Sequence, residues 1–230
     1  MDSKKNSFNN LAFTLAEILI TIGIIGVVAA LTIPNILTNY REKVVITRLK
    51  KVYSILNQAI ALSEEKNGSC TTWDYGDENN HRDADFMEIW WKNYMDEYIP
   101  NIVTAKKLST PTTSISGNGG YMLFLKDGTA LRIESIPGSY LWIVMYVKPR
   151  LNISDFTSGA TQKNMVSGRD YFAMFLMPDR KCAFDVDYYN DLNRASLIEA
   201  CKSTREHGGT CFKLIKDNGW EIPSDYPIRF

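Results

Sequence analysis

An apolar run near the start of the chain is the strongest signal in its pattern of hydrophobic and polar positions. Residues 13–33 include twelve Phe, Leu, Ile or Val side chains and one charged residue, Glu17. At a helical rise of about 1.5 Å per residue, this run is long enough to cross a hydrocarbon core of ~30 Å. Its apolar side chains contribute roughly −4 to −7 kcal/mol to insertion, against about +2.5 to +3.5 kcal/mol for an acid at the centre and less near the end. The pattern therefore predicts a membrane-spanning helix over residues 13–34.

The next segment, residues 35–66, has the periodicity of an amphipathic helix. Its inward positions recur every three or four residues, as they do on one face of a helix. They are Val45, Leu49, Val52, Leu56, Ala59 and Ser63. Joined to the apolar run, this segment predicts a single helix of about fifty residues, half in lipid and half packed on a globular head. Gly68 is expected to end it.

The rest of the chain, residues 67–230, predicts a globular head that begins with a polar loop and a short helix. Residues 86–98 have helical spacing, and Pro100 should stop the helix. The side chains expected to face inward are Phe86, Ile89, Trp90 and Tyr94. At this spacing, aromatic residues are more typical of a core than of a ligand-stacking platform.

Runs of β-branched and aromatic residues predict an antiparallel sheet in the head. Residues 121–133 have the pattern of a β-hairpin around a turn at Lys126-Asp127-Gly128. The other expected elements are strands at residues 140–147, 171–177 and 182–186 and a short helix at 192–201. The expected fold class is α+β, with the long N-terminal helix packed on an antiparallel sheet.

The charge balance argues against a general nucleic-acid binder. Lys+Arg and Asp+Glu both number 26, so the formal net charge is zero and no overall field attracts nucleic acid. The 230 residues suffice for one domain with a sizeable core and an appended helix. No specific nucleic-acid partner is therefore expected.

Residue patterns that carry catalysis or bind a metal are scarce. The chain has no G-x-S-x-G, H-E-x-x-H or G-x-x-x-x-G-K-[ST] signature, so we expect neither an enzyme nor a cofactor. Asp185, Asp187 and Asp191 have nearly the spacing of a calcium-binding loop. However, Tyr189 and Asn190 stand where such a loop needs an oxygen ligand and a Gly. We therefore expect no metal site.

The four cysteines form an even set without a C-x-x-C pair. Disulfides formed in an oxidising compartment are the simplest interpretation. Cys201 and Cys211 close a short loop that contains Gly208-Gly209, so we expect this pair to be joined and Cys70 then to pair with Cys182. Four cysteines allow three connectivities, and the other two stay open on the sequence alone.

The residues at the start of the apolar run resemble a known processing site. The stretch Ala12-Phe13-Thr14-Leu15-Ala16-Glu17, followed by an uninterrupted Ile/Leu/Val run, resembles the prepilin cleavage site shared by type IV pilins and type II secretion pseudopilins. Ala12 stands where that family usually has Gly. The resemblance is very specific from Ala12 to about Pro34, looser to about Leu62 and only suggestive beyond.

The resemblance implies how the N-terminus is processed and used. A membrane peptidase, the prepilin peptidase, is expected to cut between Ala12 and Phe13 and to N-methylate Phe13. Residues 1–12 are then a cytoplasmic leader that is removed. Glu17 becomes an acid five residues into the mature chain and is expected to act with Phe13 in assembly. The positions that match the family's helix-loosening residues are Gly23, Gly26 and Pro34.

The resemblance also implies a structural function. The chain is expected to be a subunit of a type IV pilus or of a type II secretion pseudopilus, with a pilin-like head. Its precursor is expected in the bacterial inner membrane, single-pass with the leader inside, and the mature subunit in a filament at the cell surface or in the periplasm. The expected partners are prepilin peptidase, other pilin or pseudopilin subunits, the inner-membrane assembly platform and membrane lipid.

Two observations keep another interpretation open. Lys4 and Lys5 before the run, with Val28-Ala29-Ala30 inside it, also fit an ordinary secretory signal, which implies a secreted or membrane-anchored extracytoplasmic binding protein. A basic cluster follows the span, and the positive-inside rule alone places the head in the cytoplasm. Its members are Arg41, Lys43, Arg48, Lys50 and Lys51. The processing motif and the cysteines favour an external head.

Overall fold

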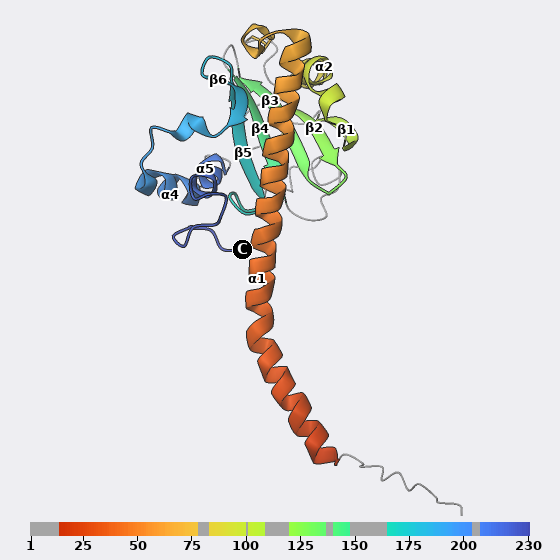
Figure 1. Cartoon of the computed structure of the whole chain (residues 1–230), viewed down its shortest axis with the longest axis vertical. Coiled ribbons are helices and arrows are strands. Elements are labelled where there is room, and N and C mark those ends of the chain that lie inside the picture. The colour runs from red at the N-terminus through yellow and green to blue at the C-terminus, as the bar shows by residue number, and fades with distance from the viewer. Residues whose placement is uncertain are drawn as a thin grey trace, which may run out of the picture. The chain divides into compact units, whose positions relative to one another are not determined.

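The computed structural model of the chain contains two compact units, residues 1–41 and residues 42–230. Helix α1 (Leu15–Asn67) starts in the N-terminal unit and ends in the C-terminal unit (Figure 1). The structure describes residues 14–77, 83–99, 101–108, 120–136, 140–147, 165–203 and 208–230.

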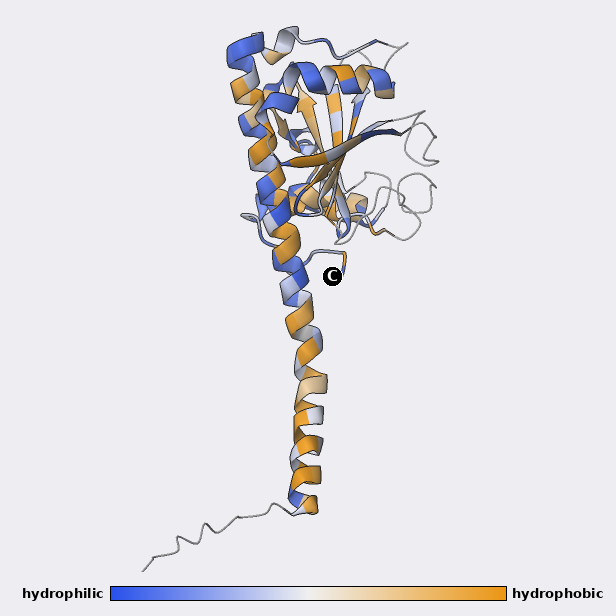
Figure 2. Cartoon of the chain, turned by 90° about the vertical axis from the view of Figure 1, so that its right-hand side faces the viewer, coloured by the Kyte–Doolittle hydropathy of each residue, from blue (hydrophilic) through white to orange (hydrophobic). Residues whose placement is uncertain are grey.

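In the N-terminal unit, α1 exposes apolar side chains on all sides. Figure 2 shows this part of the helix as mostly hydrophobic. Leu15 is 80% exposed and Ile25 is 66% exposed, and no part of the most apolar 18-residue window of α1 is buried. By length and composition, α1 is able to cross a membrane. The expected long apolar helix near the N-terminus is therefore present.

The C-terminal unit is built on a six-stranded antiparallel sheet whose strands neighbour one another in chain order (Figure 1). The strands are β1 (Ile102–Leu108), β2 (Gly120–Leu125), β3 (Ala130–Ile136), β4 (Tyr140–Tyr146), β5 (Tyr171–Met177) and β6 (Lys181–Asp185). This meander, together with the long helix, confirms the α+β class. The predicted hairpin corresponds to β2 and β3, and the three other predicted strands correspond to β4, β5 and β6.

The part of α1 in the C-terminal unit buries the stripe that the sequence predicted. Its buried positions include Val45, Leu49, Val52, Leu56, Ala59 and Ser63. Burial of a Leu or Val side chain contributes about 1.5–3 kcal/mol, so this stripe is a major source of the stability of the head. Gly68, at φ +77°, follows the last helical residue and donates its N–H to the Glu64 carbonyl at 3.0 Å. Because glycine adopts this left-handed conformation without strain, it ends α1 as predicted.

Helix α2 (Ala84–Tyr94) corrects one prediction from the sequence. Its buried side chains are Met87, Trp90 and Trp91. Ile89, which was predicted to face inward, is 59% exposed, and Phe86 and Tyr94 are only partly buried. The two adjacent indoles, with a methionine three and four residues before them, set a different inward face. Ile89 consequently lies toward solvent.

The end of α2 also differs from the prediction. The sequence predicted helix through residue 98, whereas α2 ends at Tyr94 and a short 3₁₀ turn, η2 (Asp96–Tyr98), follows. Asp96 accepts a hydrogen bond from the Trp91 indole at 3.2 Å. This contact fixes the chain just beyond the helix. Pro100, the predicted stop, lies outside the described residues.

Among the described residues, three helical elements follow the sheet, and two of them were not predicted. The turn η4 (Asp187–Tyr189) leads to α4 (Arg194–Lys202), which corresponds to the predicted helix at residues 192–201. Helix α5 (Gly209–Asp217) was missed because it begins at the second glycine of the pair Gly208-Gly209, a pattern typical of a loop. Strand β1 was missed as well. Its Lys106-Lys107 pair suits a protected sheet edge, and Lys107 pairs with Asp85 of α2 at 2.6 Å.

The C-terminus of α5 has the hydrogen bonds of a Schellman motif. Gly219, at φ +73°, donates to the Lys216 carbonyl at 3.1 Å, and Trp220 donates to the Ile215 carbonyl at 2.9 Å. The backbone of Trp220 is also in the left-handed region, with φ +67°. Its indole contacts the rings of Tyr53 and Phe212, at centroid distances of 5.2 and 5.5 Å. The ring contacts hold Trp220 in a conformation that a side chain rarely adopts.

This conformation predicts an unusual order of stability for two substitutions of Trp220. Both Trp220→Ala and Trp220→Gly lose the ring contacts, but only glycine relieves the left-handed strain of about 1–2 kcal/mol. Glycine normally costs about 0.4–1 kcal/mol relative to alanine through the unfolded chain. We therefore expect the free energy of unfolding of Trp220→Gly to exceed that of Trp220→Ala by roughly 0.5–1 kcal/mol. Trp220→Gly should then unfold at a higher urea concentration. The reverse order in detergent-solubilised full chain would contradict the strain.

Candidate functional site

The first turn of α1 contains a capping box made by Thr14 and Glu17. The Glu17 carboxylate accepts hydrogen bonds from the Thr14 N–H at 2.8 Å and from its hydroxyl at 2.7 Å. In return, the Glu17 N–H donates to the Thr14 hydroxyl at 3.3 Å. These contacts satisfy donors that a helix N-terminus leaves open, and the helix dipole favours an acid there. No role was predicted for Thr14, although the T-x-x-E spacing of Thr14 and Glu17 is a capping signal.

The hydroxyls of Thr21 and Thr32 in the apolar segment are satisfied within the helix. The Thr21 hydroxyl donates to the Glu17 carbonyl and the Thr32 hydroxyl to the Val28 carbonyl, both at 2.9 Å. In a hydrocarbon environment each polar group left without such a partner costs several kcal/mol. Both threonines are therefore compatible with insertion into lipid.

The expected helix-loosening residues lie on α1 without a packing role in this chain. A Cβ added at Gly23 or Gly26 would meet no atom within 4 Å. Pro34 is inside the helix and has no N–H to donate to the carbonyl one turn before it. Their loosening role stays a prediction. The expected processing residues, Ala12 and Phe13, lie outside the described residues.

Part of the basic cluster that follows the span holds α1 in the head. The Arg48 guanidinium donates to the Val147 carbonyl at 2.6 Å and to the Asp127 carbonyl at 3.0 Å. Lys51 forms an ion pair with the Asp127 carboxylate at 2.7 Å. Burial works against the charge on Asp127, but hydrogen bonds from Lys51 and Thr129 hold its pKa below its usual value. These cations therefore have a structural use in the head.

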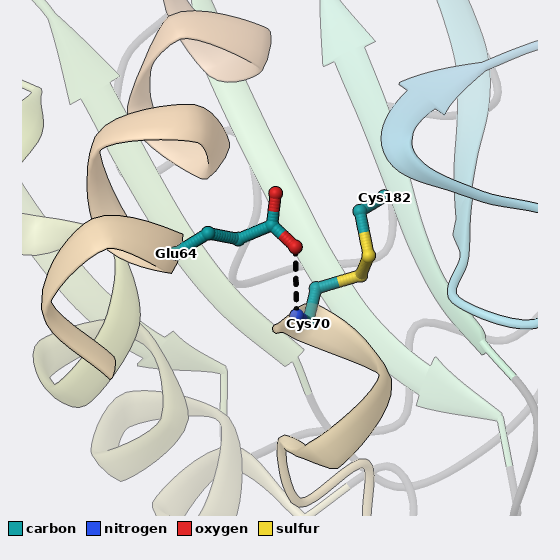
Figure 3. Close-up of side chains that lie close together, drawn as sticks. All are labelled: Glu64, Cys70 and Cys182. Carbon is teal, nitrogen blue, oxygen red and sulfur yellow. Dashed lines mark hydrogen bonds between the residues drawn. A yellow bond between two sulfur atoms is a disulfide. The ribbon is translucent and has the colours of Figure 1, made fainter. Parts of the chain in front are cut away.

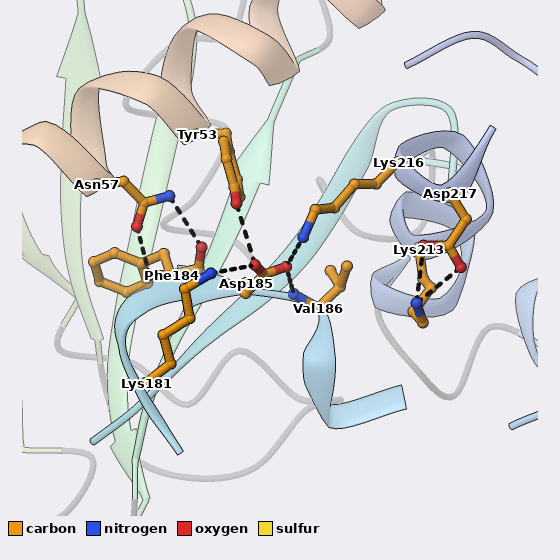
Figure 4. A network of polar contacts seen from close by, with 9 residues as sticks. All are labelled: Tyr53, Asn57, Lys181, Phe184, Asp185, Val186, Lys213, Lys216 and Asp217. Atoms are coloured by element: carbon orange, nitrogen blue, oxygen red, sulfur yellow. Dashed lines mark hydrogen bonds and ion pairs between the residues drawn. The ribbon is translucent and has the colours of Figure 1, made fainter. Parts of the chain in front are cut away.

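A second polar contact centres on Asp185, whose side chain is 4% exposed (Figure 4). It accepts hydrogen bonds from the Tyr53 hydroxyl of α1 at 3.1 Å, from the Val186 N–H at 2.7 Å and from Lys216 of α5. The Lys181 ammonium lies 3.5 Å from the Asp185 carboxylate. Burial raises the pKa of Tyr53 to about 12, with help from the Asp185 charge. The Asp185 carboxylate thus joins α1, β6 and α5.

Asn57 of α1 binds the backbone of β6 at two points. Its side-chain oxygen accepts the Phe184 N–H at 2.7 Å, and its amide donates to the Phe184 carbonyl at 3.1 Å. This arrangement imitates a neighbouring strand and occupies part of the edge of the sheet. It lies beside the Asp185 contact in Figure 4. No short sequence pattern predicts this contact, because the two residues are far apart in the chain.

Two disulfides are present, and they are the pairs expected from the sequence. Cys70 is joined to Cys182, and Cys201 is joined to Cys211. The first connects the turn after α1 to β6, and the second connects α4 to α5. In the loop-entropy account, a link across a separation of 112 residues stabilises the fold by about 4–5 kcal/mol.

Glu64 lies beside the first disulfide, as Figure 3 shows. Its carboxylate accepts the Cys70 N–H at 2.9 Å. Among the described residues, Glu64, Cys70 and Cys182 form the one group of ligand atoms close enough to share an ion. Because both sulfurs are in the disulfide, neither is a thiolate ligand. The contact is therefore structural.

The comparisons with known proteins identify a family. A model described as "Family of unknown function (DUF6613)" matches residues 35–230. The match begins directly after Pro34, so the apolar segment precedes it. No curated protein and no solved structure matches the chain.

The Asp185 contact predicts a pH-dependent loss of stability on substitution. Burial alone would raise its pKa, but the hydrogen bonds from Lys216 and Val186 lower it overall. The charged form therefore stabilises the fold above the ordinary carboxyl pKa near 3.8, and this stability is lost as the pH falls through the lower folded value. We expect Asp185→Asn to cost about 2–3 kcal/mol at neutral pH and less below about pH 4.

Urea unfolding of the full chain, followed by tryptophan fluorescence between pH 7 and pH 3, measures this effect. Asp191→Asn is the matched control, because Asp191 is exposed and the chemical change is the same. Equal midpoints for the two variants at pH 7 would show that Asp185 does not hold the three elements together.

Proposed function

Because the chain belongs to a family of unknown function (DUF6613), we propose its role from its own architecture. We propose that it is a structural subunit of a type IV pilus or type II secretion pseudopilus. The precursor lies in the bacterial inner membrane with its leader, residues 1–12, inside. Prepilin peptidase cuts before Phe13, and the subunit joins others through α1 at the inner-membrane assembly platform. The role is structural rather than catalytic.

The uncovered apolar surface of α1 carries the proposal. A long helix that exposes Leu, Ile and Val on all sides is not stable in water, since each such side chain gains about 1.5–3 kcal/mol when it is buried. Lipid covers this surface in the precursor, and neighbouring helices cover it in a filament. The head, a helix on an antiparallel sheet, suits a subunit that presents a folded domain beside an assembly helix. Two disulfides suit an oxidising compartment outside the cytoplasm.

Glu17 gives the proposal its specific mechanism. It is the one charged residue between Thr14 and Tyr40. In the single subunit its carboxylate bonds to Thr14. A cut before Phe13 creates a positive amine next to Thr14, and by resemblance the acid of an incoming subunit meets the Phe13 amine of a subunit already in the filament. This pairing neutralises both charges in a low-dielectric setting and fixes the axial register.

The capping box also supports a second candidate, a membrane-tethered extracytoplasmic binding protein. Its Thr14–Glu17 contacts would begin the helix of a plain signal anchor equally well. In that case Glu17 serves the helix start and no partner subunit needs its charge. The two candidates therefore differ in whether the cap or the charge of residue 17 matters.

Two substitutions of Glu17 separate the cap from the charge. Glu17→Gln keeps the capping box, because glutamine is also accepted at this position, but it removes the charge. Glu17→Val removes both. We expect each variant to insert, to be cut and to fold, and to be absent from filaments, because an unpaired partner charge in the assembly costs roughly 3–5 kcal/mol.

The measurement compares the membrane fraction with the sheared-filament fraction of cells that express each variant. Glu17→Asp, which keeps the charge, is the control and should retain part of the assembly. Normal filament yield from Glu17→Gln would show that assembly needs the cap of residue 17 and not its charge. The absence of the unaltered chain from the sheared-filament fraction would support the tethered protein instead.

A further inference from the structure

Helix α1 changes character directly after Pro34. Before this residue it is apolar on all sides, whereas after it the apolar side chains gather on one. At about 100° per residue, Ile36, Leu37, Tyr40 and Arg41 fall within an arc of about 140°, which we call the Tyr40 face. Thr38 and Asn39 fall on the opposite side. Ile36 is 63% exposed, Leu37 47% and Tyr40 65%.

The Tyr40 face lies at a defined level along the helix. Tyr40 is about 37 Å from Leu15 at 1.5 Å per residue, and a tilt of ~20° reduces this to about 35 Å. The hydrocarbon core is ~30 Å thick, and the bilayer with its headgroups is ~40–45 Å thick. A helix that enters the core at Leu15 therefore brings Tyr40 and Arg41 to the headgroup layer of the opposite leaflet.

The side chains of this face suit that layer. Tyrosine has an apolar ring and a polar hydroxyl, and it concentrates at membrane interfaces for this reason. Arginine donates several hydrogen bonds in a fixed planar arrangement that matches phosphate. The Arg41 side chain is exposed and has no ion pair or hydrogen bond with any residue that the structure describes. Arg48, by contrast, is bonded to carbonyls of the head.

We propose that the Tyr40 face binds the headgroup layer of the leaflet facing away from the leader, with the Arg41 guanidinium on the phosphates of anionic phospholipid. The inference rests on the proposed membrane insertion of α1 and adds a lipid-binding surface to it. A second copy of α1 is the competing occupant of this face. Arg41 argues against it, because a guanidinium enclosed between helices without a partner is costly.

Spin labels at three positions test the level of the face. Ile25→Cys, Tyr40→Cys and Leu62→Cys are labelled in the full chain, whose own cysteines are in disulfides. After reconstitution into phosphatidylcholine vesicles with about a third phosphatidylglycerol, collisions with oxygen and with a water-soluble nickel chelate are measured. We expect the Ile25 label to be protected from nickel, the Leu62 label to be open to it, and the Tyr40 label to lie between them.

The three labels distinguish failure of the inference from failure of the proposed function. A Tyr40 label as open to nickel as the Leu62 label, with Ile25 protected, would overturn the headgroup contact and leave the span intact. A Tyr40 label protected from both oxygen and nickel would overturn the headgroup contact and indicate that this face packs against another helix. An Ile25 label open to nickel would overturn the membrane span itself, and the inference with it.

Lipid preference tests the role of Arg41. A donor dye at Asn39→Cys is combined with acceptor-labelled phosphatidylglycerol or acceptor-labelled phosphatidylcholine. We expect an enrichment of the anionic lipid of about fivefold near the dye, the ratio that corresponds to ~1 kcal/mol for one basic residue. Arg41→Gln should remove most of it, whereas Arg41→Lys and the head-surface control Lys126→Gln should retain it. Equal ratios in the parent and in Arg41→Gln would overturn the assignment.

Discussion

The uncovered apolar surface of α1 is the constraint on which the rest of the structure depends. Between Leu15 and Ile33 no side chain in the most apolar window is buried in the chain, so the surface has to be covered by lipid or by other helices. The polar side chains of the segment are compatible with lipid or with packed helices around it. Its threonine hydroxyls bond to the helix backbone, and its one acid caps the helix start. Either cover therefore meets few unsatisfied polar groups.

In the head, one side of the same helix is buried and the other is exposed to solvent. The apolar stripe supplies the buried side, and three polar contacts flank it. They are made by Arg48 and Lys51 with the β2–β3 turn, by Tyr53 with Asp185, and by Asn57 with the edge of β6. The cations that follow the span are thus partly committed to the head.

How much of this was predictable follows from how local each signal is. The stripe from Val45 to Ser63, the stop at Gly68 and the later strands depend on periodicity and turn chemistry, and they were predicted. The inward face of α2 was wrong at Ile89, because the packing of two neighbouring indoles decides it. The burial of the ion pair that Arg132 and Glu134 form within β3 depends on tertiary packing that no short pattern reveals. The same holds for the Asp185 contact. At the candidate site, Glu17 was identified because it is a charged residue in an apolar run, but its capping partner Thr14 was overlooked.

The central claim, that this chain is cut and assembled like a pilin subunit, is tested most directly by the N-terminal residue of the protein recovered from its native membranes. Intact-mass analysis with N-terminal sequencing measures it, and neither depends on a variant. The account predicts a mature chain that begins at N-methylated Phe13 and retains Glu17. A chain that begins at Leu31, after an ordinary signal cleavage, or one that still carries residues 1–12, would contradict it.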